Sequence, residues 1–249
     1  MLSPNMIEVI KEQAYAGAPS SFSNICKVHP LTIYEIIEMG TNIYNSRLGL
    51  LLLTEVDIAR IIKEKTGQEV QIETIHPLSY LLQNAEHDDM FLLELQSCFS
   101  TFIKEEILLL PKINSVLVGD MKDKRLITDN NYNEFQDILR IQNRKKVKKA
   151  PPENESAIAR KFRLKREERD AAKRKQQAKN GDGQSLSELL EIAETFGIDY
   201  NNKTVYAFYG LIQRHQAREK WNQDIQMLCA GADSKKLKTK YWGESLEEK

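Results

Sequence analysis

Histidine and cysteine are the side chains that most often bind metals or act as nucleophiles, and the chain holds only four histidines and three cysteines. They are scattered, without the short recurring spacing that a zinc site requires. The nearest approach to a cluster is His87, followed by Asp88 and Asp89. Two carboxylates are also favoured where a helix begins, because they face the positive end of its dipole. We therefore predict a helix start here and no metal site.

Sequence patterns for catalysis and cofactor binding are missing as well. The glycines are spread along the chain and form no phosphate-binding loop. No GxSxG motif presents a serine nucleophile, and no cysteine has an obvious histidine partner. Adjacent acidic pairs such as Glu105-Glu106 are typical of surface charge. The sequence therefore predicts no catalytic residue, no cofactor and no enzymatic activity.

The strongest chemical signal is a basic stretch in the middle of the chain. Residues 140–179 contain 16 Lys/Arg and 5 Asp/Glu, whereas residues 1–139 contain 11 basic and 20 acidic side chains. The zero net charge of the chain thus conceals oppositely charged parts. The cations that we single out as candidates for electrostatic contact are Lys145, Lys146, Lys148, Lys149, Arg163 and Arg166.

Three interpretations of this basic stretch remain open. It could neutralise phosphates, which gives salt-sensitive binding of nucleic acid without sequence preference. It could be a solvated linker, kept extended by its like charges and barred from helix formation at Pro151-Pro152. It could also dock onto an acidic surface. We favour the linker, because Phe162 is the only aromatic side chain there that could stack on a base.

Residues 1–143 are expected to fold as an α+β domain in which helices dominate. Capping-box spacings begin at Thr32 and Thr54, and apolar side chains recur at helical spacing after each. The helix after Thr32 is expected to continue to Leu48. Residues 18–28 are small and polar, and are interpreted as a loop or one short extended piece.

A small antiparallel sheet is predicted in the second half of this domain. Short apolar runs at residues 107–110, 115–118 and 125–128 are separated by turn residues, which is the pattern of paired strands. A helix is expected to follow, capped by Asp129 or Asn130.

The chain is predicted to continue as a basic, flexible linker over residues 144–184 and a three-helix module over residues 185–249. Ser185 begins a capping-box spacing, a longer helix begins near Thr204, and Asp233 is expected to cap a final short helix. The predicted fold class is mainly α, with an α+β N-terminal domain and a small C-terminal helical bundle.

The C-terminal module is rich in aromatic side chains, and a bundle of this size needs only some of them for its core. Aromatic residues and arginine dominate the binding energy of protein interfaces. We single out as candidates for partner binding Tyr206, Tyr209, Arg214, Trp221, Tyr241 and Trp242.

Composition also bears on where the protein acts. No apolar run approaches the roughly 20 residues that span a membrane, and the N-terminus shows no secretory signal. Three widely spaced cysteines are typical of a reducing compartment. We expect a soluble cytoplasmic protein without a membrane partner.

Two stretches carry a resemblance to a known family. One is NYNEFQDIL at residues 131–139 with Gln142-Asn143; the other is YAFYGLIQRHQA at residues 206–217, continuing to Tyr241-Trp242. Together they resemble tail assembly chaperones encoded by tailed phages and prophages of Gram-positive bacteria. The stretches cover about a fifth of the chain and include no catalytic motif.

The resemblance implies a non-enzymatic factor of virion morphogenesis, working in the cytoplasm of the host cell. Such chaperones bind the long tape-measure protein and bring tail-tube subunits to it; self-association is a further expectation. Two modules on a tether would raise the effective concentration of one partner near another. A nucleic-acid-associated accessory protein that uses the basic linker and a minor structural component of the virion are the alternatives.

Overall fold

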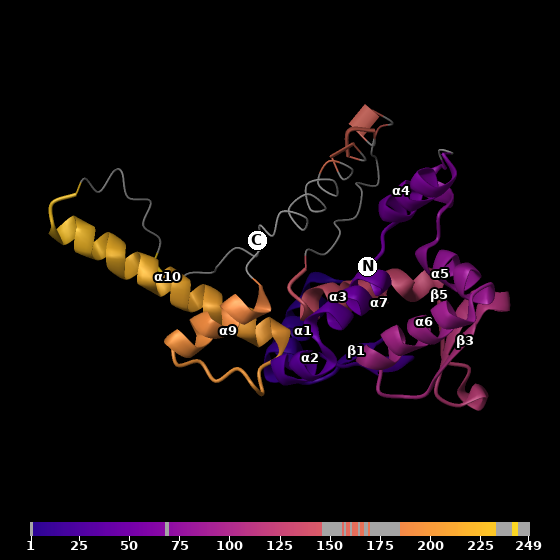
Figure 1. Cartoon of the computed structure of the whole chain (residues 1–249), viewed down its shortest axis with the longest axis horizontal. Coiled ribbons are helices and arrows are strands. Elements are labelled where there is room, and N and C mark those ends of the chain that lie inside the picture. The colour runs from indigo at the N-terminus through magenta and orange to yellow at the C-terminus, as the bar shows by residue number, and fades with distance from the viewer. Residues whose placement is uncertain are drawn as a thin grey trace.

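The computed structural model describes residues 2–67, 70–145, 185–232 and 241–243, and in between residues 156, 158–159, 161–163, 165–166 and 169. The fold is mainly α-helical with small antiparallel sheets, as predicted (Figure 1). The α-helices are α1 (Pro4–Ala16), α2 (Ile33–Met39), α3 (Thr41–Leu51), α4 (Glu55–Thr66), α5 (Pro77–Glu86), α6 (Asp89–Phe102), α7 (Asp129–Gln142), α9 (Leu186–Thr195) and α10 (Val205–Cys229). The strands are β1 (Ser20–Phe22), β2 (Cys26–Val28), β3 (Ile107–Leu110), β4 (Ser115–Val118) and β5 (Leu126–Thr128), and the short 3₁₀ helices are η1 (Ile72–Thr74), η2 (Pro111–Ile113) and η3 (Met121–Asp123).

Helix starts follow from local side-chain chemistry, as the sequence predicted. The Thr32 hydroxyl accepts a hydrogen bond from the Glu35 backbone N–H at 3.2 Å, and the Glu35 carboxylate accepts one from the Thr32 backbone N–H at 2.8 Å. The same reciprocal capping box begins α4 at Thr54 and α9 at Ser185. Each box satisfies two backbone donors that have no partner within the helix.

Two local expectations were wrong in detail. The helix expected to run to Leu48 is divided into α2 and α3 at Gly40, whose φ of 91° lies outside the helical region. Residues 18–28, expected to form a loop or one short extended piece, contain two strands, β1 and β2, paired antiparallel with Ser20 opposite Val28. The hairpin forms because alternate side chains of both strands are buried while those between them are exposed.

The second sheet has the predicted antiparallel order β3-β4-β5. The helix after it is capped one residue earlier than expected. Thr128 forms a capping box with Asn131, and the Asn131 side chain accepts a hydrogen bond from the Thr128 backbone N–H at 2.9 Å. Asp129 does not cap the helix and instead links α7 to α5, because its carboxylate accepts hydrogen bonds from the hydroxyl and backbone N–H of Ser79.

Helix α7 lies at the centre of the hydrophobic core. The ring centroid of its Phe135 is 5.6 Å from that of Phe99 on α6 and 5.7 Å from that of Phe22 on β1. The Tyr132 hydroxyl and the Gln136 amide both donate to the Leu51 carbonyl at 2.8 Å, which holds the end of α3 against α7. Such buried bonds are needed because an unpaired polar group in the core costs free energy.

Arg140 belongs to this core, although it is the first residue of the basic stretch over residues 140–179. It is 5% exposed, and its guanidinium donates to the Asp137 carboxylate at 2.9 Å and to the Gln136 side chain at 3.2 Å. A buried arginine requires such partners, since removing its charge from water is costly. The cationic surface therefore begins later in the chain than the sequence suggested.

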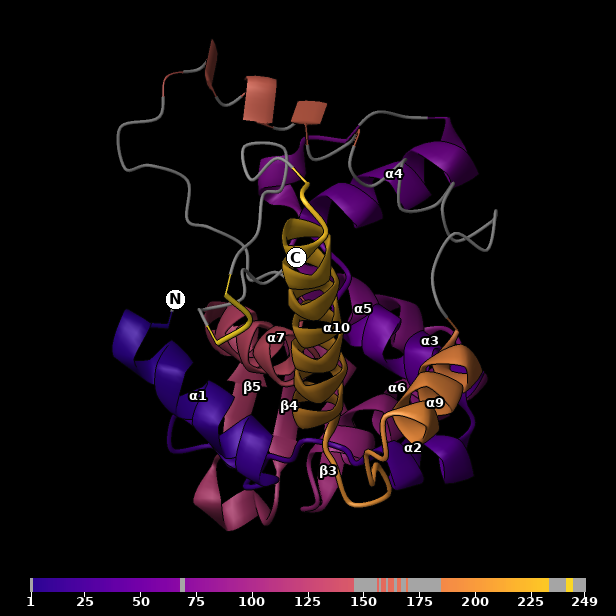
Figure 2. The ribbon, with the colours of Figure 1, turned by 90° about the vertical axis from the view of Figure 1, so that its left-hand side faces the viewer.

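Helices α9 and α10 pack onto the N-terminal domain and share its core. Leu189, Phe208 and Ile212 belong to the same hydrophobic cluster as Ile10 of α1. Figure 2 shows α10 between α1 and α9, with α7 behind it. The C-terminal module was predicted as a bundle with a core of its own; instead α10 packs against α1 and α7, and α9 packs against α10 within the shared hydrophobic cluster. The helix expected from Asp233 lies outside the described residues.

A short backbone pairing completes this contact. The Ile33 N–H donates to the Lys203 carbonyl at 2.8 Å, and the Val205 N–H donates to the Leu31 carbonyl at 3.2 Å. The hydroxyl of Thr204, buried between these bonds, donates to the Ala14 carbonyl at the end of α1 at 2.6 Å. The start of α10 is therefore fixed by both side-chain packing and backbone hydrogen bonds.

Candidate interaction surface

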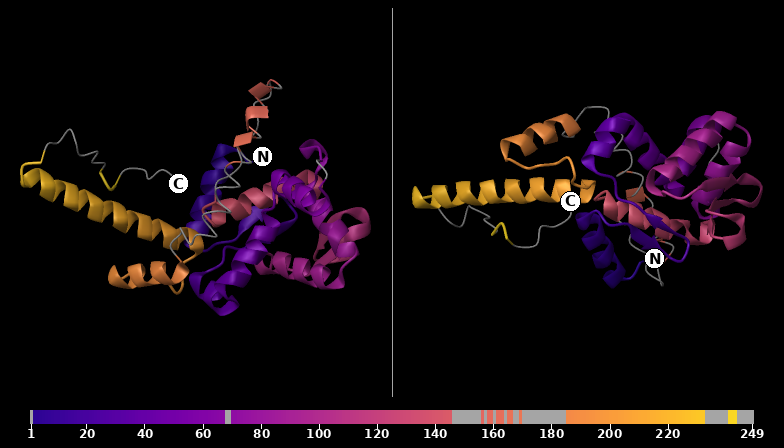
Figure 3. Two further views of the ribbon diagram at one scale, coloured as in Figure 1. Left: turned by 45° about the horizontal axis from the view of Figure 1, so that its top comes forward. Right: turned by 90° about the horizontal axis from the view of Figure 1, so that it is seen from below.

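Helix α10 is divided into an anchored half and a projecting half. In the anchored half, residues 205–212, Phe208 is fully buried and Ile212 is 2% exposed. In the projecting half, residues 213–229, every described side chain is half-buried or exposed. We call residues 2–143 together with α9 the body. Figure 3 shows the projecting half of α10 extending beyond the helices of the body. His215 of this half stacks on Phe196, the residue after α9, at 5.0 Å between ring centroids, and the exposed side chains beyond it are accessible to a partner.

Four of the six candidate partner-binding residues lie together. Arg214 and Trp221 are on the projecting half, and Tyr241 and Trp242 are on the chain that returns to it. The rings of Trp221 and Tyr241 meet edge to face at 5.8 Å between centroids, and Tyr241 lies 5.6 Å from Trp242. The Arg214 guanidinium donates to the Trp242 carbonyl at 2.8 Å, which holds the returning chain against the helix. We call Trp221, Tyr241 and Trp242 the aromatic cluster. Tyr241 is 52% exposed, so the cluster offers aromatic surface to solvent.

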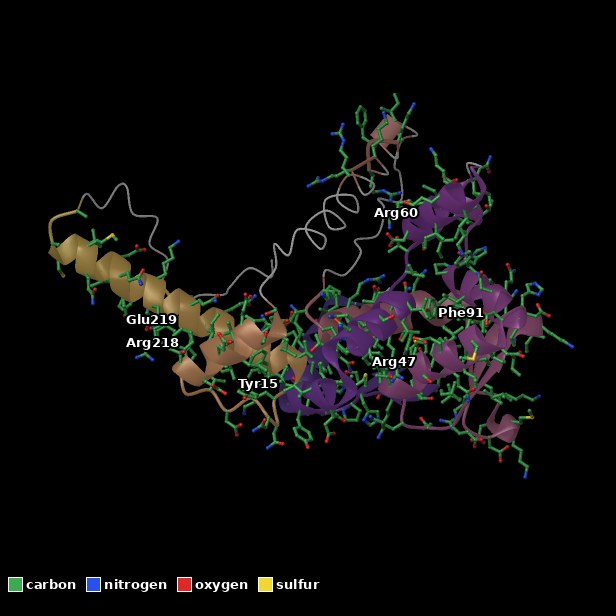
Figure 4. The ribbon with its side chains drawn as sticks, viewed as in Figure 1. Tyr15, Arg47, Arg60, Phe91, Arg218 and Glu219 are labelled. Atoms are coloured by element: carbon green, nitrogen blue, oxygen red, sulfur yellow. The ribbon has the colours of Figure 1, made fainter. Side chains whose placement is uncertain are left out.

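An apolar stripe continues from the cluster toward the end of α10. Ile225 and Leu228 follow Trp221 at intervals of four and three residues, which places all three on one helix face. Ile225 is 36% exposed and Leu228 is half-buried. Arg218 and Glu219, both exposed, extend from the middle of the helix (Figure 4). The surface thus combines aromatic and apolar groups with a charged rim, the composition of a protein interface.

The other two candidates, Tyr206 and Tyr209, lie at the joint between α10 and the body. The guanidinium carbon of Arg144 is 4.4 Å from the centroid of the Tyr206 ring. The Tyr209 ring meets Phe208 edge to face at 5.7 Å, and burial raises the pKa of the Tyr209 hydroxyl. These two tyrosines are used within the chain, so they are not part of the projecting surface.

Arg144 holds α10 to the end of α7, a role that the sequence did not reveal. Its guanidinium donates to the Tyr206 carbonyl at 2.9 Å and to the Gln213 side chain at 2.6 Å. A Cβ at Gly210 would lie 2.6 Å from the same guanidinium, so Arg144 fits only where this helix position lacks a side chain. A glycine inside a helix was the available signal, because it is unfavourable there unless another group needs the space.

The candidate electrostatic residues are only partly described. Lys145 and Arg166 are exposed and Arg163 is half-buried, whereas Lys146, Lys148 and Lys149 lie outside the described residues. Phe162 is 70% exposed. The structure does not bring these residues onto the aromatic cluster in any contact between described residues.

No group of three or more His, Cys, Asp and Glu side chains among the described residues could hold a metal ion. The helix start predicted from the adjacent carboxylates is present. Asp88 caps α6, and its carboxylate accepts hydrogen bonds from the backbone N–H groups of Met90 at 3.0 Å and Phe91 at 3.1 Å. No described helix has the length and apolarity to span a membrane.

One cysteine does lie near a histidine. Cys26 and His29 line the same surface cleft. Burial raises the pKa of the Cys26 thiol to about 12, with the negative charge of Glu105 adding to the effect. Because the thiolate is the nucleophile, a thiol with this pKa is inert near neutral pH. The pair therefore lacks the chemistry of a catalytic dyad.

Comparison with known proteins adds no assignment. No family model matches the chain, and no curated protein and no solved structure matches it. The function therefore has to be argued from the surface of the molecule itself.

Proposed function

We propose that this protein is a non-enzymatic assembly factor that binds a partner protein on the projecting half of α10. The observation that carries the proposal is the aromatic cluster, which is held in place by Arg214 and exposed at Tyr241. Ordered aromatic side chains bind partners effectively because little side-chain entropy remains to be lost. The rest of the molecule holds the start of this helix by packing and backbone hydrogen bonds.

A tail assembly chaperone is the form of assembly factor that we propose. The sequence resemblance includes residues 206–217 and Tyr241-Trp242, which lie along α10 and in the cluster. The partner would be the tape-measure protein or the tail-tube protein, met in the cytoplasm of the host cell. A projecting helix with a narrow apolar stripe suits a partner that also presents a helix.

The packing of α9 and α10 changes how the basic connector can act in this proposal. Arg144, the first residue of the linker over residues 144–184, contacts α10, and the chain after the linker continues into α9. Both ends of the connector are therefore attached to one body. The connector then separates no two freely moving modules, and partner recruitment rests on α10 and any surface on the body itself.

The experiment is a pull-down of the tagged full-length chain from phage-infected or prophage-induced cells. Recovery of tape-measure or tail-tube protein is the expected result. Tyr241→Ala should lose that protein, whereas Tyr34→Ala should retain it. Tyr34 is a matched control because it is 51% exposed on α2, against 52% for Tyr241. Equal recovery by both variants would contradict the assignment to α10.

Nucleic-acid binding is the second candidate function, and the exposed Lys165, Arg166 and Arg169 favour it. Neutralising phosphates makes affinity fall steeply with salt. A titration against random duplex and single strands should therefore show binding that weakens as salt rises. Absence of binding at physiological salt would remove this candidate.

A structural role in the virion is the remaining alternative. A chaperone should leave the assembled tail, so mass spectrometry of purified particles should not find this chain. Its presence in stoichiometric amounts would favour the structural component.

A further inference from the structure

A polar cleft lies on the body, in a region that the proposed function does not use. Its volume is about 460 Å³, and its lining comes from the β1–β2 hairpin and from the residues that precede β3 and β5. Ser21 is paired with Lys27 across the hairpin, so both side chains point to the same side. His29 follows Lys27 by two residues and shares that side. Three polar side chains are thereby gathered along one wall.

Several charged groups at the cleft are already engaged. The Arg125 guanidinium donates to the Glu105 carboxylate at 2.6 Å and to the Ile25 carbonyl at 3.0 Å. The Ser23 hydroxyl donates to the Glu134 carboxylate at 3.1 Å. Arg125 also lies 3.7 Å from the Asp123 carboxylate, so two carboxylates share its charge and it offers no free positive charge to a ligand.

The lining groups that remain available are the hydrogen-bond donors Ser21, Asn24, Lys27 and His29, of which Lys27 carries a positive charge. Lys27 and Asn24 are exposed, and Lys27 forms no ion pair with a described residue. The pKa of His29 is lowered, first by burial and then by the positive charges of Lys104 and Lys27, against the smaller opposing effects of Glu35 and Glu105. The balance at the His29 ring is thus positive. A negative ligand would relieve it.

We propose that this cleft binds an oxyanion, either a phosphate group or a carboxylate. The ammonium of Lys27 would supply the charge, and the Ser21 hydroxyl, the Asn24 amide and the His29 ring would donate hydrogen bonds to the oxygens. Oxyanions are bound in this way because charge-assisted hydrogen bonds are stronger than neutral ones. Cys26 takes no part as a nucleophile, since its thiol is buried within the lining and protonated.

The test follows the His29 ring by NMR in the full-length protein, in chloride and in sulfate at equal ionic strength. Sulfate keeps a constant charge between pH 5 and pH 8. A bound anion within about 6 Å raises the pKa of a histidine by favouring its charged form. We expect sulfate to raise the pKa of His29 by at least about half a pH unit, equivalent to about threefold tighter sulfate binding by the protonated ring.

Two lysine variants make the test specific. Lys27→Gln should weaken sulfate binding about tenfold, the loss of one charge-assisted contact, and should therefore reduce the pKa change at the same sulfate concentration. Lys112→Gln, which removes an exposed charge from η2, should leave both unchanged. An equal response of His29 to chloride and sulfate would overturn the proposal. So would an unchanged response in Lys27→Gln, provided that its thermal unfolding matches that of the wild type.

The source of the oxyanion is settled by a second arm with acetate in place of sulfate. A response to sulfate alone assigns the cleft to phosphate groups, and a response to acetate alone assigns it to carboxylate side chains of a partner. A response to neither contradicts the proposal.

Discussion

The two halves of α10 differ in what their apolar side chains touch, although one continuous helix forms both. Residues 205–212 bury Val205, Phe208 and Ile212 against the body. Residues 213–229 keep a comparable spacing of apolar groups at Trp221 and Ile225, but every described side chain there stays half-buried or exposed. The Trp221 ring meets that of Tyr241 from the same chain. The first half anchors the helix and the second half is available to a partner.

This difference separates stability from binding within a single element. Most helical stability in proteins comes from packing of an apolar face, so the anchored half should govern the stability of the joint. The projecting half should govern partner affinity. Thiol labelling and substitutions in the two halves test this division, in order of decreasing expected effect.

Thiol labelling should show the largest contrast between body and projection. Burial, aided by the charge of Glu94, raises the pKa of Cys98 in α6 to about 12, whereas Cys229 at the end of α10 is exposed. An increase from 9.0 to about 12 lowers the thiolate fraction near neutral pH about a thousandfold. Because thiolate nucleophilicity rises with pKa, only part of this factor carries over to the rate, and the burial of Cys98 adds to it. A disulfide reagent should therefore label Cys229 at least about tenfold faster than Cys98. Similar rates would mean that the body opens readily.

Truncation of the anchor should have the next largest effect. Phe208→Ala removes a fully buried ring and should cost about 3–5 kcal/mol in the free energy of unfolding. Ile225→Ala, on the projecting half, should cost less than about 1 kcal/mol, because Ile225 is 36% exposed. Urea denaturation followed by circular dichroism measures both. Equal losses would remove the distinction between the halves.

The joint itself should contribute less. Arg144→Ala removes two hydrogen bonds and the contact with the Tyr206 ring, and should cost about 1–3 kcal/mol. Lys145→Ala, the exposed neighbour, should change the free energy of unfolding by less than about 0.5 kcal/mol. If the two variants have the same effect in urea denaturation, Arg144 does not hold α10 to the body.

A pair of glycine substitutions should give the smallest difference. Gly49→Ala meets open space in α3 and should stabilise the protein by about 1 kcal/mol through helix propensity. Gly210→Ala should lose that gain, because its Cβ displaces the Arg144 guanidinium. Thermal unfolding of the two variants provides the comparison. An equal increase in Tm would show that Arg144 can move aside without cost.

Much of the local structure could be read from the sequence because its causes are local. The capping boxes at Thr32, Thr54 and Ser185 involve side chains three residues apart, so their spacing is visible in the chain. The break at Gly40 could not be predicted, because apolar side chains recur at helical spacing on both sides of it. The order of the second sheet followed from short apolar runs and turn residues.

The candidate site was less accessible to sequence reasoning because burial is a tertiary property. Arg140 and Arg144 have the same side chain as other residues of the basic stretch, yet the first is paired inside the core and the second holds α10. Helical spacing likewise places Phe208 and Trp221 on apolar faces without telling which face will be covered. The return of Tyr241 to Trp221 depends on contacts across twenty residues of chain.

The most direct test is the affinity of the pulled-down partner for full-length wild type and for Trp221→Ala, measured by calorimetry. We predict at least tenfold weaker binding, about the loss of one interface hot spot, with the free energy of unfolding changed by less than about 1 kcal/mol. Tyr34→Ala should bind like the wild type. Unchanged affinity in a folded Trp221→Ala variant would contradict the account.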